Sequence, residues 1–94
     1  MMNTDIKQKP IKAFIPESIG LTMFLSEKII LTKNPKDKVV GKELFEKYLL
    51  WCESRKCIPY TRNRFYLNVE KVGNIASEIS AKSRRNYFEI KIIE

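Results

Sequence analysis

The 94-residue sequence contains no histidine and only two cysteines, Cys52 and Cys57. Without histidine, any catalytic site would lack the side chain that most often transfers protons at neutral pH. Two cysteines cannot complete a four-ligand zinc site without carboxylates or a second chain. Both lie near the end of one expected helix, where they are not expected to meet as a disulfide. We therefore expect a core thiol at Cys52, a loop thiol at Cys57, no metal site and no cofactor.

Long apolar runs are also missing. No stretch approaches the roughly 20 apolar residues that a membrane-spanning helix needs, and the first residues lack the continuous apolar stretch of a secretory signal. The chain has no GxxxxGK[ST] loop to hold nucleotide phosphates and no carboxylate pair at a recognisable catalytic spacing. These absences predict an intracellular protein that does not associate with membranes and is not an enzyme.

The formal charge of +7 is the strongest signal that is present. Residues 1–40 carry seven basic and four acidic groups (net +3), residues 41–60 four and three (net +1), and residues 61–94 seven and four (net +3). Such an excess favours a polyanionic partner. The last third is rich in arginine, whose planar fork suits phosphates and base edges. Its arginines are Arg62, Arg64, Arg84 and Arg85. A solvated basic surface is the alternative, and composition leaves it open.

The length is that of one domain with one modest core. Residues 1–15 are polar, contain three lysines and are interrupted by Pro10, which predicts a flexible basic arm or linker. Such a segment is either a plain leader or an arm that touches phosphates. Residues 16–94 hold the periodic apolar patterns and form the predicted folded domain.

The first half of that domain is predicted to contain a helix, a strand and a second helix. A helix is expected from Pro16 to about Leu31, and Gly20 places its firm start near Leu21. Residues 34–37 (NPKD) are a turn signal, and Val39 with Val40 forms a very short strand.

Residues 41–54 form the most strongly periodic helix. Leu44, Tyr48 and Trp51 fall on one line of its surface, which indicates a face that packs into the core. A short link over residues 55–60, which contains Pro59, separates it from the next helix. Two helices joined in this way form a helix-turn-helix pattern.

The second helix of this pattern is expected over residues 61–72. Thr61 suits the N-cap and Gly73 suits the terminator. Its inward stripe consists of Phe65, Val69 and Val72. Its outward face carries Asn63, Arg64, Leu67 and Lys71, flanked by Arg62 and Tyr66. A short helix with a basic outer face fits the major groove of DNA.

A hairpin is predicted to follow, with strands over residues 75–81 and 87–93. Phe88, Ile90 and Ile92 are expected to face the core. The tip of the hairpin is polar and basic: Lys82, Ser83, Arg84, Arg85 and Asn86. The order helix, short strand, helix, helix, strand, strand is that of a winged helix-turn-helix. The predicted class is therefore α+β, with three helices and a small antiparallel sheet.

Several segments together resemble a known family. The segment 42–54 (KELFEKYLLWCES) is similar to a helix in the C-terminal domain of poxvirus-type helicase-primases, which occur in large DNA viruses and some phages. Phe24-Leu25, the run 34–39 (NPKDKV) and the inward Phe65 extend the resemblance over residues 21–93. The resemblance implies a winged-helix DNA-binding module appended to a hexameric helicase. The chain has no acidic primase triad, so it resembles either an excised domain or a stand-alone relative, and both stay open.

Together these features predict a non-enzymatic DNA-binding domain. The resemblance implies a role in viral DNA replication, in the cytoplasm or the nucleus of an infected cell. Helix 61–72 would lie in the major groove, and the tip 82–86 would contact phosphates. The predicted contact residues are Arg62, Asn63, Arg64, Tyr66, Lys71, Lys82, Ser83, Arg84, Arg85 and Asn86. The predicted partners are double-stranded or forked DNA, and helicase-primase or other replication proteins.

Two residues fit this hypothesis poorly. Leu67 is apolar yet points outward, and Glu70 would repel phosphate. A protein-interaction module, anchored by Tyr60, Tyr66 and Leu67, would explain an exposed apolar side chain better. The sequence is also compatible with a small viral transcription regulator, and with RNA rather than DNA as the ligand.

Overall fold

The computed structural model of the protein describes residues 14–80 and 84–93. Its helices are α2 (Glu17–Lys28), α3 (Gly41–Arg55) and α4 (Arg62–Gly73). Its strands are β1 (Ile29–Leu31), β2 (Lys38–Val40), β3 (Ser77–Ile79), β4 (Arg85–Phe88) and β5 (Ile90–Ile92). The predicted α+β class, with its order of helix, strand, helix, helix and strands, is confirmed. None of the helices in the described ranges has both the length and the apolar character that crossing a membrane requires.

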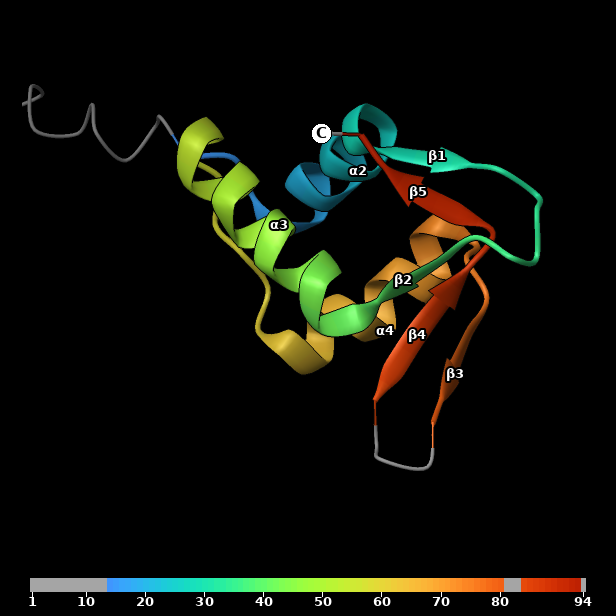
Figure 1. Ribbon diagram of the computed structural model, residues 1–94. Helices are drawn as coiled ribbons and strands as arrows, with labels where there is room; N and C mark the ends of the chain where they lie inside the picture. Colours follow the sequence, from blue (N-terminus) through green and yellow to red (C-terminus); the bar gives the residue numbers. More distant parts are fainter. Residues whose placement is uncertain (1–13, 81–83, 94) are drawn as a thin grey trace, which may run out of the picture.

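The strands form two small antiparallel sheets. β4 lies between β2 and β3, and its Tyr87 pairs with Val39 on one side and with Ser77 on the other. β1 pairs with β5 in a separate two-stranded sheet. In Figure 1 the hairpin of β3 and β4 projects away from the helices, and α4 lies behind β2 and β4. The short strand before α3 is thus tied to the hairpin that follows α4.

The prediction that the first helix extends to Leu31 was wrong. α2 ends at Lys28, and Ile29 to Leu31 form β1, with Ile29 opposite Ile92 and Leu31 opposite Ile90. Two adjacent β-branched isoleucines favour an extended backbone. Leu31, which was expected to end that helix, is 58% exposed. Tertiary pairing with β5 therefore decides the conformation of these three residues.

The prediction of one continuous strand over residues 87–93 was also wrong. Glu89 has a left-handed backbone with φ of 64°, which separates β4 from β5. Its backbone N–H donates to the carbonyl oxygen of Asp37 at 2.8 Å, and its carbonyl oxygen accepts from the N–H of Thr32 at 2.8 Å. The interruption reverses the side-chain phase, so Tyr87 is fully buried whereas Phe88, expected in the core, is half-buried.

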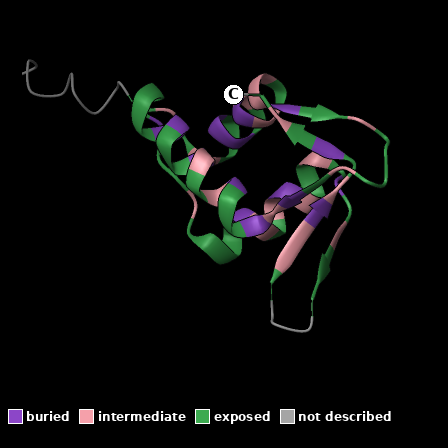
Figure 2. Cartoon of the chain, in the orientation of Figure 1, coloured by how far each residue is buried: buried purple, intermediate pink, exposed green. Residues whose placement is uncertain are grey.

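Within the core, contacts between aromatic rings join the three helices. The rings of Tyr48 and Phe65 stack with centroids 4.4 Å apart, which links α3 to α4. Phe24 meets Tyr48 edge-on at 5.4 Å and Trp51 at 5.8 Å, which links α2 to α3. Figure 2 shows the buried residues gathered on the inner sides of the helices and central strands. The predicted inward line of the α3 helix is confirmed.

The link between α3 and α4 is tightly held. Lys56 is left-handed with φ of 57°, and the N–H of Cys57 donates back to the carbonyl oxygen of Cys52 at 2.8 Å, which closes the helix end. The Tyr60 N–H donates to the Tyr48 hydroxyl at 2.9 Å. Ile15 runs alongside, bonded to Lys56 and Ile58. The arrangement of α3 and α4 relative to each other is therefore fixed by the core itself.

Gly20 allows α2 to approach this link closely. The helix begins at Glu17, so the prediction that Gly20 delays its firm start was wrong. A Cβ atom on Gly20 would lie 2.0 Å from the Sγ atom of Cys57, which is itself 5% exposed. Cys57, expected as an unremarkable loop thiol, is thus a packing partner of α2.

We expect Gly20→Ala to destabilise the protein by about 1–3 kcal/mol, because overpacking outweighs the better helix propensity of alanine. Urea unfolding measures the loss. Adding Cys57→Ala removes the clashing sulfur, so the double variant should lose less than the sum of the two single losses. A Gly20→Ala variant as stable as the wild type would contradict the close approach.

Candidate nucleic-acid interface

The outer face of α4 carries four of the residues that the sequence placed there. Asn63, Arg64 and Lys71 are exposed, and Leu67 is 57% exposed. The inward Phe65 and Val69 are fully buried, so the phase of the helix is set by the core. The predicted outward face is confirmed.

The two ends of α4 differ from the prediction. Thr61 occupies the N-cap position as expected, but its side chain makes no capping hydrogen bond. At the other end Gly73 belongs to the helix, and Asn74 with φ of 52° is the left-handed cap. Asparagine tolerates this conformation better than most residues do. Val72, predicted to face inward, is 50% exposed because the helix ends beside it.

The two arginines of α4 lie over aromatic rings. The guanidinium carbon of Arg62 is 5.7 Å from the ring centroid of Phe45, and that of Arg64 is 5.8 Å from the ring of Tyr60. Such cation–π contacts contribute about 0.5–1 kcal/mol at exposed sites. They also limit the side-chain freedom that binding would have to remove. Both guanidinium groups are thus partly ordered while remaining exposed.

The predicted hairpin residues are placed differently from one another. Arg84 is exposed just before β4, and its carbonyl oxygen accepts from the N–H of Ser80 at 2.7 Å, which closes the hairpin. Asn86 is half-buried within β4, opposite Val40 and Glu78. Lys82 and Ser83 lie outside the described residues.

Arg85 is paired within the protein rather than pointing freely outward. Its Nη1 atom donates to the Glu70 carboxylate and, at 3.3 Å, to the hydroxyl of Ser77. Its guanidinium carbon lies 5.0 Å from the ring centroid of Tyr66. The negative charge of Glu70, expected to repel phosphate, is therefore neutralised locally. Sequence spacing gave no signal for this pair, because it depends on how the hairpin folds back onto α4.

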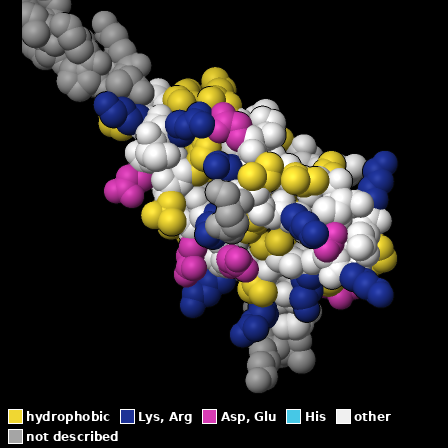
Figure 3. Space-filling view, turned by 45° about the horizontal axis from the view of Figure 1, so that its top comes forward, with side chains coloured by type: hydrophobic (Ala, Val, Ile, Leu, Met, Phe, Trp, Pro, Cys, Tyr) yellow, Lys and Arg dark blue, Asp and Glu magenta, His cyan; other side chains and the backbone are white. Residues whose placement is uncertain are grey.

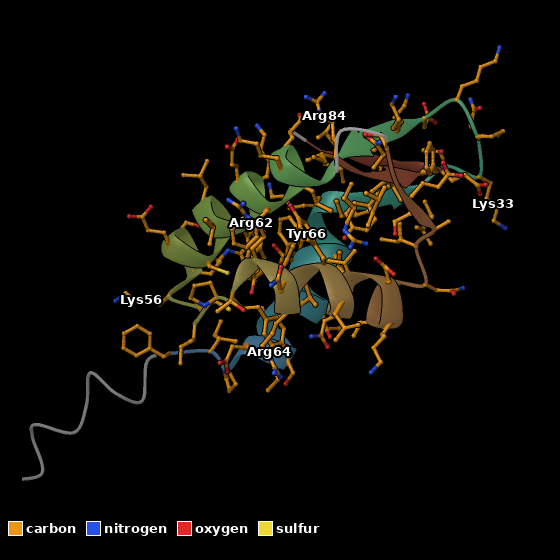
Figure 4. The ribbon with its side chains drawn as sticks, turned by 90° about the horizontal axis from the view of Figure 1, so that it is seen from below. Lys33, Lys56, Arg62, Arg64, Tyr66 and Arg84 are labelled. Carbon is orange, nitrogen blue, oxygen red and sulfur yellow. The ribbon has the colours of Figure 1, made fainter. Side chains whose placement is uncertain are left out.

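An open groove of about 770 Å³ runs between α4, the start of α3 and the hairpin. From α4 it is lined by Arg62, Asn63 and Tyr66, and from the hairpin by Ile79, Arg84 and Arg85. Figure 4 shows Arg62 and Tyr66 between α4 and α3, Arg84 across from them, and Arg64 on the opposite edge of α4. Five predicted contact residues thus surround one groove, whereas Arg64 and Lys71 lie outside it.

The groove also contains residues that sequence reasoning did not assign to the site. Lys42, Glu43 and Glu46 reach it from the first turns of α3, and Val40 reaches it from β2. Their spacing indicated only a solvated helix face. Pairing of β2 with β4 brings the start of α3 beside the hairpin, and that pairing has no local sequence signal. The groove therefore has both basic and acidic walls.

Basic side chains are not confined to this region. Figure 3, which looks toward the top of the molecule, shows Lys and Arg side chains spread over the visible face with acidic ones between them. The site is therefore distinguished by its arrangement on α4 and the hairpin rather than by charge density alone. Within the described ranges, no three side chains of the metal-ligating types gather in one place.

Known proteins give no further guidance on the site. Comparisons of the chain with protein-family models, with curated proteins and with solved structures give no match.

Proposed function

We propose that this chain is a non-enzymatic, winged-helix DNA-binding domain. Its α4 helix would enter the major groove of a duplex, and its β3–β4 hairpin would lie beside the phosphates. One observation carries the proposal: α4 exposes Asn63, Arg64 and Lys71, while its only carboxylate, Glu70, is paired with Arg85. A helix about 10–12 Å across fits a major groove about 12 Å wide.

The exposed side chains suit distinct contacts in that groove. Arg64 can donate a bidentate pair to guanine, and Asn63 can bond adenine in the same two-point manner. Lys71 can neutralise a phosphate as a point charge. Leu67 can contact a thymine methyl group. An exposed leucine in the centre of this face is therefore compatible with base contact.

The wider setting of the proposal comes from the resemblance to poxvirus-type helicase-primases. On that basis we propose that the domain acts in viral DNA replication inside an infected cell, as the C-terminal module of a helicase-primase or as its stand-alone relative. Forked DNA and other replication proteins would then be partners besides the duplex. A small viral transcription regulator would use the same surface.

Duplex titration at several salt concentrations tests the DNA-binding proposal. About 4–6 phosphate contacts predict that the logarithm of affinity falls with the logarithm of salt concentration at a slope near −4 to −5. The double variant Arg64→Gln/Lys71→Gln should bind about tenfold or more weakly, and the magnitude of its slope should fall by about 1–2.

The matched control is Lys33→Gln/Lys56→Gln, which removes the same charge. Figure 4 places these two lysines at opposite ends of the molecule, beyond the two ends of α4. The control should keep most of the affinity. Equal weakening by both double variants would show that net charge alone binds DNA, and affinity insensitive to salt would rule out the proposed phosphate contacts.

A protein-interaction module is the second candidate, and an apolar groove favours it. This groove lies near the end of α4, where the half-exposed Val72 and Leu31 of β1 both line it. The anchors expected from the sequence are less suitable, because Tyr60 and Tyr66 are half-buried against the core. Chemical-shift mapping separates the candidates. DNA should perturb residues 62–71 together with Arg84 and Asn86, whereas a spectrum unchanged by DNA would favour a protein partner.

A further inference from the structure

The pair of Arg85 and Glu70 belongs to a network that joins three elements. Arg85 begins β4, Glu70 lies on α4, and Ser77 begins β3. The Ser77 hydroxyl donates to the Oε2 atom of Glu70 at 2.9 Å, and Arg85 Nη1 donates to both partners. Each member thus contacts the other two, so both strands of the hairpin are bonded to the same carboxylate on α4.

The network packs against aromatic residues of the core. The Arg85 guanidinium carbon lies 5.0 Å from the ring centroid of Tyr66, whose ring lies 6.2 Å from that of the buried Tyr87. The Tyr87 hydroxyl donates to the carbonyl oxygen of Tyr66 at 3.4 Å. The Arg85 and Glu70 side chains are 26% and 36% exposed, so water screens the pair only in part.

The start of α3 also packs against this point. A Cβ atom on Gly41 would lie 3.2 Å from the carbonyl oxygen of Arg85 and 3.2 Å from the Cε1 atom of Tyr66. Glycine therefore lets α3 approach the network more closely than a larger residue would. As a result Arg85 is surrounded by protein on several sides, unlike Arg84, which is exposed.

We propose that Arg85 is a positioning residue, which with Glu70 and Ser77 fixes the angle between the hairpin and α4. This inference rests on the proposed function and changes the role of one predicted contact residue. Contact with phosphate then falls to Arg84, while Arg85 keeps the two parts of the surface at a set separation. A duplex meets a preformed surface, so less conformational freedom is lost on binding.

The variant Glu70→Gln tests the positioning role, because the positioning role and simple competition for Arg85 predict opposite changes in DNA affinity. Removing a negative charge from a DNA-binding surface normally strengthens binding, and it would do so if Glu70 merely competed with phosphate for Arg85. If the network positions the hairpin, affinity should instead fall by about twofold to fivefold, with an unchanged salt slope. Glu46→Gln is the matched control, because it removes a groove carboxylate outside the network. Its affinity should rise slightly.

Amide hydrogen exchange in the free protein provides a readout that does not depend on DNA. Glu70→Gln should speed exchange in β3 and β4 by about twofold to fivefold, while exchange in α3 stays unchanged. Arg85→Lys keeps the charge but loses the fork, so it should act like Glu70→Gln in both measurements. If Arg85 were a simple phosphate contact, lysine would preserve most of the affinity.

The outcomes separate the two proposals. Faster hairpin exchange in both variants supports the positioning role, whether or not the wild-type protein binds a duplex. Failure of the wild-type protein to bind a duplex would contradict only the proposed function. Unchanged exchange in β3 and β4 overturns the positioning role, and so does a Glu70→Gln affinity equal to or above that of the wild type.

Discussion

Replacing Trp51 with alanine should lower the unfolding free energy of this domain by about 3–5 kcal/mol. Trp51 is 5% exposed on α3, and its ring meets Phe24 edge-on at 5.8 Å. Its Nε1–H donates to the Oε1 atom of Glu27 at 3.3 Å, and Arg55 binds the same carboxylate at 2.6 Å. Truncation therefore leaves a cavity between α2 and α3 and removes one partner of Glu27. Domains of this size are marginally stable, so the loss is a large fraction of the total.

Denaturant unfolding of Trp51→Ala and Trp51→Phe separates packing from the hydrogen bond. Phenylalanine keeps much of the ring but loses the N–H group, so its cost should be clearly smaller than that of alanine. In the wild type, hydrogen bonds from Arg55 and then from Trp51 lower the pKa of Glu27. The pKa of Glu27 should therefore rise in Trp51→Phe. An alanine variant within about 1 kcal/mol of the wild type would contradict burial of Trp51 in the core.

The elements with strong local periodicity were predictable from sequence. Residues 41–54 repeat apolar side chains at helical spacing, and the helix lies at Gly41–Arg55. The turn at residues 34–37 and the short strand around Val39 were also expected, because proline and paired valines act over few residues. Such signals need no knowledge of the rest of the chain.

Elements that depend on distant partners were not predictable in the same way. No proline or glycine separates Ile29 to Leu31 from the residues of α2, so the sequence gives no stop signal there, and pairing with β5 makes them a strand. Likewise the hydrogen bonds of Glu89 to Asp37 and Thr32 break the last strand and bring Tyr87 into the core. The alternation of apolar and polar residues cannot reveal a break of this kind. The break shifts the side chains that follow it by one position, which moves them to the other face of the strand.

The candidate site shows the same division. Asn63, Arg64 and Lys71 were placed correctly, because the buried Phe65 and Val69 fix the rotation of one helix. The surroundings of Arg85 were not foreseen. Its position was predicted as a free hairpin tip, but it lies in β4 and bonds Glu70 across the interface with α4. Charge counts describe how many groups exist, whereas pairing decides which of them remain available to a partner.

The core also contains four ionisable side chains, and because of them we expect the protein to lose stability at alkaline pH. Burial raises the pKa of the Cys52 thiol from 9.0 to about 12, and burial also raises the pKa of the neighbouring Cys57 thiol. Burial likewise raises the pKa values of the Tyr48 and Tyr87 hydroxyls above their ordinary 10.0. All four groups therefore hold their protons in the native state at pH values where the unfolded chain releases them.

The unfolding free energy should therefore be constant up to about pH 8 and fall above about pH 9, first through the thiols and then, above about pH 10, through the tyrosines. Each group that is protonated only in the native state contributes a slope of up to about 1.4 kcal/mol per pH unit. Denaturant unfolding at a series of pH values measures the decline. Cys52→Ala removes one titrating group, so it should lower the initial stability but flatten the decline. A stability unchanged between about pH 8 and 11 would mean that these groups reach solvent.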